Sequence, residues 1–100
     1  MDYLKVDIVI AHSYLRELIT LLESLGVTSY TVLEITHTKK AGGHERLAEG
    51  LLSVTRSSLL FTIASEKLTK TIIEKVQPYL TDRDGFLIAY PVSYVGAAPT

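Results

Sequence analysis

Two kinds of hydrophobic spacing alternate along the chain, and their order constrains the fold more than any other feature. Residues 3–11, YLKVDIVIA, alternate apolar and polar side chains with a period of two, which is typical of a strand with one buried face. The side chains expected to face the core are Leu4, Val6, Ile8 and Ile10. Residues 12–26 then repeat apolar side chains at helical spacing, with Ser13 as the expected N-cap and Gly26 just past the C-terminus.

The chain returns to strand-like composition twice before its second helix. Residues 28–38 are rich in β-branched and aromatic side chains and predict a second strand. Residues 57–65 predict a third strand. The side chains of this strand expected to face the core are Leu59, Phe61 and Ile63.

A second helix and a fourth strand complete the pattern. Residues 65–80 carry apolar side chains at helical spacing and begin with Ser65, a good N-cap. Pro78 is expected to end or distort the last turn of this helix. Residues 86–96 predict the fourth strand, and Pro91 favours an edge position for it.

The resulting order is strand, helix, strand, strand, helix, strand. Two strand–helix–strand units with right-handed crossovers give the α+β ferredoxin-like βαββαβ architecture, a four-stranded antiparallel sheet with both helices on one face. We expect residues 1–100 to form a single domain of this kind.

The other face of such a sheet needs cover. The side chains expected there include Val9, Ser58, Leu60 and Ala64, with little charge. An exposed apolar face is a liability for a monomer, so we expect an oligomer that packs its sheets together. A monomer with a mildly apolar open face is the alternative.

Composition excludes several classes of protein. The net charge is −1 and the pI is about 6.3, which argues against a dedicated nucleic-acid binder. Cysteine is absent, so no disulfide framework is expected. The N-terminus does not resemble a signal peptide and no uncharged run is long enough to span a bilayer, so we expect a cytoplasmic protein without membrane insertion. Nucleophile-elbow, Walker and HExxH motifs are missing, and we expect no enzymatic activity.

A polar, basic stretch interrupts the pattern between the second and third strands. It runs over residues 36–57, far longer than the usual loop of ~4–6 residues. Gly42 and Gly43 allow backbone conformations closed to other residues. The cationic and hydrogen-bonding side chains suited to a phosphate or an acidic partner are Lys39, Lys40, His44 and Arg46.

The second part of this stretch carries leucines. Residues 45–52, ERLAEGLL, are expected to form a transient helical turn that presents Leu47, Leu51 and Leu52 to a partner protein. In the alternative interpretation the stretch is a surface insertion whose leucines are tucked onto the domain.

Two segments resemble the PII signalling superfamily. They are GVTSYTVLEI, residues 26–35, and RDGFLIAYPVSYVG, residues 83–96; the second is similar to PII-like proteins associated with bicarbonate transport and carboxysomes. The resemblance implies a homotrimer that binds an adenine nucleotide in clefts between subunits. It also implies that residues 38–56 form the mobile T-loop, which contacts a regulated partner such as a membrane transporter or an enzyme.

The resemblance also carries over a set of site residues. Ser29, Thr31 and Ile35 lie on the strand beside the adenosine, and the backbone of Thr36, His37, Thr38 and Lys39 wraps the phosphates. Backbone groups of Ile63, Ala64 and Ser65 of the neighbouring subunit read the adenine edge, and Gly85 and Phe86 form the turn that approaches the nucleotide. The partner-binding loop residues are Lys40, Gly42, Gly43, His44, Arg46, Leu47 and Leu51. Without the resemblance, Thr31, Ile35 and Ile63 would be interpreted as ordinary strand packing.

Three departures from the nitrogen regulators of that superfamily bear on the ligand. THTKKAGG, residues 36–43, lacks their glutamine, Phe86 stands where they place a lysine, and the terminal GAAPT lacks their two arginines. A triphosphate normally needs several charged hydrogen bonds. We therefore expect AMP, ADP or cyclic AMP to be favoured over ATP, without 2-oxoglutarate sensing and without a tightly bound metal.

A metal-binding trimer of similar architecture is the alternative function. His37 and His44, with Glu45 nearby, offer zinc or copper ligands, although their spacing of seven fits no standard metal motif. His12 is interpreted as a turn residue that helps cap the first helix.

Overall fold

The computed structural model describes residues 2–35, 37–39, 45–47, 56–97 and 99, and side-chain positions for all of these except 37–39 and 45–47. The elements, in order, are β1 (Tyr3–Ala11), η1 (His12–Tyr14), α1 (Leu15–Ser24), β2 (Thr31–Ile35), β3 (His37–Lys39), β4 (Glu45–Leu47), β5 (Ser57–Ser65), α2 (Glu66–Thr81) and β6 (Phe86–Pro91).

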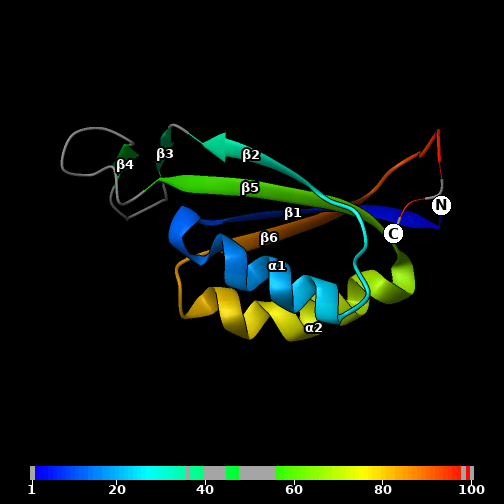
Figure 1. Ribbon diagram of the computed structural model, residues 1–100. Helices are drawn as coiled ribbons and strands as arrows, with labels where there is room; N and C mark the ends of the chain where they lie inside the picture. The colour runs from blue at the N-terminus through cyan, green and yellow to red at the C-terminus, as the bar shows by residue number, and fades with distance from the viewer. Residues whose placement is uncertain (1, 36, 40–44, 48–55, 98, 100) are drawn as a thin grey trace.

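Four strands form one antiparallel sheet in the order β2-β5-β1-β6, and α1 and α2 lie side by side on one of its faces (Figure 1). This is the predicted ferredoxin-like architecture, and it is confirmed. The strands β3 and β4 form a separate two-stranded sheet beyond the end of β2.

The core lies between the sheet and the two helices. Strand β1 alternates as predicted, with Val6, Ile8 and Ile10 buried against the helices. The helices contribute Leu18 and Leu22 from α1, and Ile72, Val76 and Leu80 from α2. Each such side chain contributes roughly 1.5–3 kcal/mol on burial, which holds both helices on this face.

Two of the predicted helix caps are confirmed. Gly26 has a φ of +108°, its N–H donates to Glu23 O at 3.1 Å, and Val27 N–H donates to Leu22 O at 3.1 Å, which is a Schellman motif. Ser65 Oγ accepts a hydrogen bond from Leu68 N–H at 3.1 Å and caps α2.

The prediction that Ser13 caps the first helix is wrong. A 3₁₀ turn, η1, precedes α1, which begins at Leu15 with no side-chain cap. The backbone N–H of His12 donates to Arg56 O at 2.7 Å, which ties this turn to the start of β5. His12 does not cap either, since no side chain caps η1 and His12 Nδ1 lies 2.9 Å from Ser58 Oγ.

Three further predictions about the strands and the residues near them also change. The strand predicted over residues 28–38 is divided between β2 and β3, which belong to different sheets. The fourth strand ends at Pro91, on an edge as predicted, rather than continuing to residue 96. Residues 45–47 form a strand, not the start of a helical turn, because they pair with β3.

Helix α2 has the predicted length of 16 residues but begins and ends one residue later than predicted. It continues through Pro78 to Thr81, so the proline does not end it. The buried side chains of Val76 and Leu80 pack against the sheet on both sides of the proline, and this packing holds the last turn in place.

The predicted faces of β5 are inverted. The side chains that face the helices, all buried, are Ser58, Leu60, Thr62 and Ala64. Leu59, Phe61 and Ile63 point the other way, because Phe61 pairs with Asp7 and paired residues share a face. Apolar side chains occur on both faces of this strand, so its spacing alone could not choose between them.

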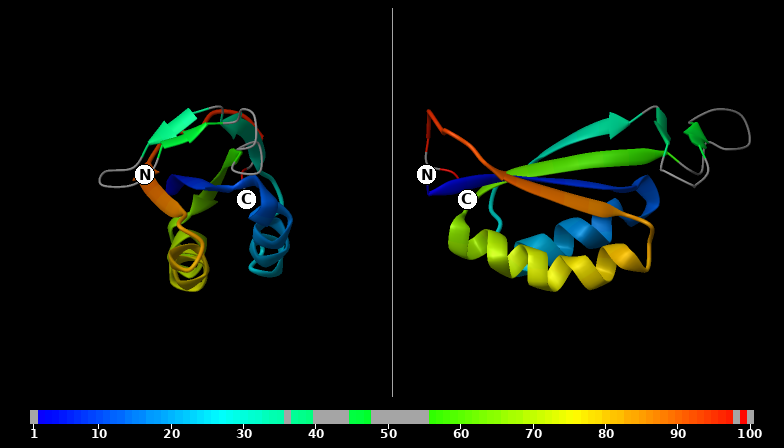
Figure 2. Two further views of the ribbon diagram at one scale, coloured as in Figure 1. Left: turned by 90° about the vertical axis from the view of Figure 1, so that its left-hand side faces the viewer. Right: turned by 180° about the vertical axis from the view of Figure 1, so that it is seen from behind.

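The sheet face opposite the helices, here called the open face, is covered by no helix of the described segments (Figure 2). The strand register places on it Tyr3, Lys5, Asp7, Val9, Thr31, Leu33, Ile35, Leu59, Phe61, Ile63, Phe86, Ile88 and Tyr90. Leu33 is 53% exposed and Ile88 is 51% exposed. The face is therefore mainly apolar and accessible in the single chain, as the prediction of an oligomer requires.

Candidate functional site

A hollow at the start of β2, here called the β2 hollow, brings together three of the predicted site residues. It has a volume of about 240 Å³ and is lined by Ser29, Tyr30, Thr31, Phe61, Thr62, Ile63, Tyr94 and Pro99. Thr31 pairs with Phe61 across β2 and β5, which places Ile63 beside the start of β2. Thr62 Oγ1 donates to Ser29 O at 2.7 Å and fixes the segment that enters the strand.

The structure also places the other residues predicted around the adenosine. Ile63 lines the same hollow as Thr31 of its own chain, and its predicted approach to the nucleotide of a neighbouring subunit stays a prediction. The Ala64 side chain is 0% exposed and faces the helices, so only its backbone is available to a ligand. Ser65 Oγ is engaged in the α2 cap. Ile35 pairs with Ser57, at the far end of β2, and does not line the hollow.

A second hollow, here called the β6 cavity, lies between α2 and the edge strand β6. Its volume is about 450 Å³, and its lining residues are Ile73, Gln77, Leu80, Thr81, Gly85, Phe86, Leu87 and Ala89. Gly85 and Phe86 are therefore both in this cavity, as parts of the turn after α2. A Cβ atom on Gly85 would lie 2.9 Å from Val9 O, so the close approach of this turn to β1 requires glycine.

The two hollows lie on opposite edges of the sheet. Thr31 is on β2 and Phe86 is on β6, with β5 and β1 between them. Three inter-strand spacings separate these edges by about 14 Å before the sheet's twist is considered. A single chain thus holds its two hollows at separate edges of the sheet.

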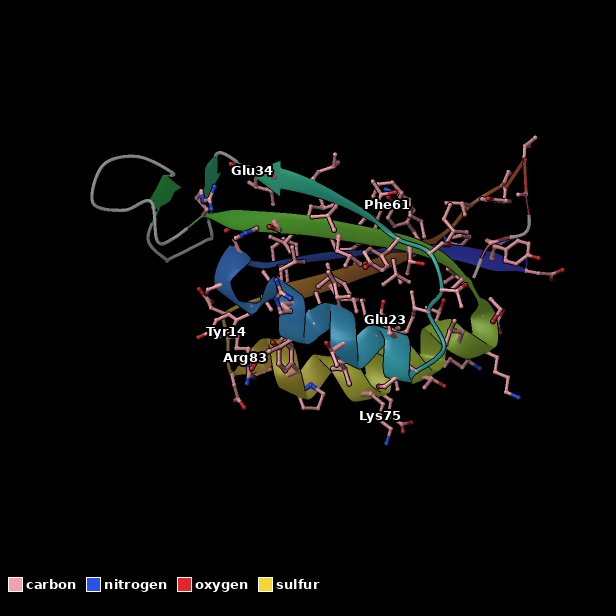
Figure 3. The ribbon with its side chains drawn as sticks, in the orientation of Figure 1. Tyr14, Glu23, Glu34, Phe61, Lys75 and Arg83 are labelled. Carbon is pink, nitrogen blue, oxygen red and sulfur yellow. The ribbon has the colours of Figure 1, made fainter. Side chains whose placement is uncertain are left out.

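The turn that carries Gly85 is fixed by Arg83, which sequence reasoning missed. The Arg83 guanidinium lies 3.9 Å from the centroid of the Tyr79 ring and 5.4 Å from that of Tyr14, and its Nη1 donates to Tyr79 O at 3.0 Å. Figure 3 shows Tyr14 and Arg83 at the same end of the helix layer. Asp84, the next residue, has a φ of +58°, so this turn has a specific, constrained backbone.

Tyr79 joins both helices at this end of the molecule. Its hydroxyl donates to Glu17 Oε1 at 2.9 Å and lies 3.3 Å from Tyr14 O. Burial, followed by the hydrogen bond to the Glu17 carboxylate, raises the pKa of Tyr79 to about 12. The aromatic residues at 14 and 79 and the arginine before the Asp-Gly turn were visible in the sequence, but nothing in their spacing predicted that they meet.

A third hollow of about 690 Å³ lies beside α1, and no predicted site residue lines it. Its lining residues are His12, Ser13, Leu15, Arg16, Ile19, Thr20, Glu23 and Tyr30. Nearby, Arg56 Nη1 lies 3.7 Å from Glu34 Oε1, which links the end of β2 to the start of β5. Both side chains are largely exposed, so this pair contributes little, about 0–1 kcal/mol.

Most of the predicted loop residues are outside the described part of the chain. These are Thr36, Lys40, Gly42, Gly43, His44, Leu51 and Leu52. The backbones of β3 and β4 are described, and they pair His37 with Leu47, Thr38 with Arg46 and Lys39 with Glu45. The side-chain positions of these six paired residues are not described, so their predicted contacts with phosphate or a partner stay predictions.

The metal hypothesis is likewise untested. Among the side chains that the structure describes, no group of three or more His, Cys, Asp or Glu residues is placed to hold a metal ion. His37 and His44, the ligands that the hypothesis needs, do not belong to that set.

Comparison with known proteins identifies the family. The family model described as "Nitrogen regulatory protein P-II" matches residues 3–97. The chain belongs to the P-II family. The predicted resemblance is therefore confirmed. No curated protein shows significant similarity to this P-II family member.

Solved structures of PII-like proteins share this fold. CPII from Thiomonas intermedia K12, bound to ADP and bicarbonate, is 21% identical, with a TM-score of 0.73 over 90% of this chain and 85% of that chain. A putative PII-like signaling protein from Thermus thermophilus is 20% identical, with a TM-score of 0.71 over 90% and 89%. The GlnK–ATP complex of B. subtilis is 20% identical, with a TM-score of 0.66 over 92% and 84%. In the described part of this P-II family member, no helix has the length and apolarity needed to cross a membrane.

Proposed function

We propose that this chain is a cytoplasmic, non-enzymatic regulatory protein of the PII-like group. It binds an adenine nucleotide in the clefts between the subunits of a homotrimer. Its T-loop, residues 38–56 of a single-domain chain, regulates a partner protein such as a transporter or an enzyme. The observation that carries the proposal is the placement of the β2 hollow and the β6 cavity on opposite edges of the sheet.

Two further features support the choice of ligand. Similar folds bind ADP with bicarbonate in CPII and ATP in GlnK. Neither the β2 hollow nor the β6 cavity is lined by a lysine or an arginine in the part of the chain that the structure describes. A site with few cations suits AMP, ADP or cyclic AMP better than ATP, because each additional phosphate charge needs compensation.

A complementation experiment tests the shared cleft. Thr31→Glu places a carboxylate in the β2 hollow and Thr81→Glu places one in the β6 cavity, and each is expected to abolish ADP binding, because a carboxylate covered by an anionic nucleotide loses its water and gains no partner. Thr31→Gln and Thr81→Gln are the matched controls, since they have the same size without the charge.

The two Glu variants are then mixed, unfolded and refolded together, and ADP binding is measured by calorimetry. If each cleft combines the β2 hollow of one chain with the β6 cavity of the next, mixed trimers regain some intact clefts and binding returns. Binding that stays absent in mixed trimers, while both Gln controls bind, would show that the two hollows do not form one site.

A further inference from the structure

The third hollow, here called the α1 hollow, lies between one face of the first helix and Tyr30, which precedes β2. Its volume of about 690 Å³ is within the usual range for small-molecule sites. The lining residues Arg16, Thr20 and Glu23 follow one another at spacings of four and three, so they share one face of α1. The α1 hollow is therefore a groove that runs along this helix.

The floor of the α1 hollow is apolar. Leu15 and Ile19 line it, and both are half-buried and pack against the core. Tyr30 adds a partly exposed aromatic ring from the segment before β2. An apolar group placed in the groove would be removed from water against these three side chains, which favours its binding.

The walls of the α1 hollow are fixed by contacts with the central strand β5. At one end, His12 Nδ1 lies 2.9 Å from Ser58 Oγ, which ties η1 to β5. On the other side, Thr62 Oγ1 donates to Ser29 O at 2.7 Å and holds the segment that carries Tyr30. A groove whose walls are already in place loses less conformational entropy when a ligand binds.

Two charges of opposite sign stand near the two ends of this groove. Arg16 is in the first turn of α1 and Glu23 is in the last, and Figure 3 shows Glu23 at the C-terminal end of the helix. Seven residues of helix separate their Cα atoms by about 10 Å along the axis. Among the side chains that the structure describes, neither Arg16 nor Glu23 has an ion-pair partner. Both charges are thus available to a ligand in the groove.

We propose that the α1 hollow binds a short zwitterionic peptide with apolar side chains, with its carboxylate on Arg16 and its ammonium on Glu23. Three extended peptide residues span about 10 Å, which matches the separation of the two charges. A guanidinium can donate two parallel hydrogen bonds to a carboxylate, and the Glu23 carboxylate accepts from the peptide ammonium. The first and third side chains of an extended tripeptide point the same way, so both can contact Leu15 and Ile19.

The two charges disfavour other classes of ligand. A polyanion would be attracted by Arg16 but repelled by Glu23, and a polycation would meet the reverse. An uncharged apolar molecule would cover both charges without pairing them, which is costly. The C-terminal tail of a partner protein would bring a carboxylate for Arg16 but no free ammonium for Glu23, and the test below separates this occupant from a free peptide.

The test uses the tripeptide Leu-Ala-Leu in calorimetry with the full chain. It compares the free peptide with its N-acetylated form, which lacks the ammonium, and its C-amidated form, which lacks the carboxylate. Arg16→Gln and Glu23→Gln each remove one charge from the groove, and both positions are exposed, so the variants are expected to fold. Lys75→Gln and Glu74→Gln, on the exposed surface of α2, are the matched controls for loss of one charge elsewhere.

The wild type and both α2 controls are expected to bind the free peptide about tenfold or more tightly than either blocked form. Arg16→Gln should no longer distinguish the free peptide from the amidated form, and Glu23→Gln should no longer distinguish it from the acetylated form. Absence of binding by all three forms, or equal binding of free and blocked forms to the wild type, would overturn the proposal. Equal binding of the free and acetylated forms alone would overturn it in favour of a protein C-terminus.

The proposal does not depend on the proposed nucleotide site. The α1 hollow shares Tyr30, and no other lining residue in the described part of the chain, with the β2 hollow. Thr31→Glu, which is expected to abolish ADP binding, should therefore still bind Leu-Ala-Leu as the wild type does. A wild type that binds ADP but no peptide would overturn this inference alone, and one that binds the peptide but no nucleotide would overturn the proposed function alone.

Discussion

At the scale of single residues, the contacts of Arg83 and Tyr79 connect the helix layer to the candidate site. Arg83 lies between two aromatic rings and bonds to the backbone of α2 at Tyr79, shortly before the segment that carries Gly85 and Phe86. Gly85 and Phe86 line the β6 cavity, so the contacts of Arg83 with Tyr79 and Tyr14 help to set the shape of that cavity.

The raised pKa of Tyr79 predicts a loss of stability in alkali. The pKa is about 12 in the folded chain and 10.0 in the reference state, so between these values the unfolded chain loses the proton and the folded chain keeps it. The contribution of the neutral hydroxyl is complete below about pH 10 and is lost as the pH rises toward 12. Chemical denaturation should therefore show Tyr79→Phe to be less sensitive to pH than the wild type over this window.

Tyr30→Phe is the control for this measurement, because it removes a different tyrosine from the same background of alkaline titrations. If Tyr79→Phe and Tyr30→Phe follow the same pH profile as the wild type, the Tyr79 hydroxyl does not stabilise the fold through Glu17.

At the scale of elements, Ser65 occupies a junction where strand β5 becomes helix α2. Its side chain caps the helix by accepting the Leu68 N–H, and its backbone also ends the strand next to the β2 hollow. Ser65→Ala is expected to lower the free energy of unfolding by about 0.5–2 kcal/mol, since one helix N–H loses its acceptor.

Ser65→Asp should restore most of that free energy, because aspartate caps a helix N-terminus about as well as serine. Both variants can be measured by urea denaturation of the same preparation. If alanine and aspartate at this position are equally destabilising, the cap is not the source of the effect.

How far the sequence predicted these elements depends on their patterns. Strand β1 was predicted to the residue because polar Lys5 and Asp7 alternate with Val6 and Ile8. Strand β5 had the right bounds but the wrong faces, since apolar residues lie on both sides and only pairing with Asp7 placed Phe61 on the open face. The break between β2 and β3 depends on tertiary pairing that no local pattern specifies.

At the scale of the whole molecule, the sheet leaves three surfaces available at once: two edge strands and the open face. The sequence predicted the architecture and the need for cover, because strand and helix periods are local properties. Pro91 predicted the edge position of the strand that follows Gly85, but no local pattern showed that hollows form beside Thr31 and Gly85. A cyclic assembly, which joins different surfaces of neighbouring copies, brings opposite edges together.

Which nucleotide binds is expected to depend on the side chains of both hollows, one at each edge of the sheet. Phe86 lines the β6 cavity where the nitrogen regulators place a lysine, and it is 39% exposed, so a longer charged side chain has room there. In calorimetry the wild type should bind AMP, ADP or cyclic AMP more tightly than Mg-ATP, with no enhancement by 2-oxoglutarate. Phe86→Lys should strengthen ATP binding by about tenfold or more, because it adds one charge-assisted hydrogen bond.

Phe86→Met is the matched control, because methionine is unbranched and reaches about as far as lysine but carries no charge. This variant should leave ATP binding weak. Gain of ATP affinity in both variants would mean that the phenyl ring obstructs the site rather than that a cation is missing. Tight Mg-ATP binding by the wild type, strengthened by 2-oxoglutarate, would contradict the prediction. It would also mean that cations from outside the two hollows, such as Lys39 or Lys40 of the loop, compensate the triphosphate charge.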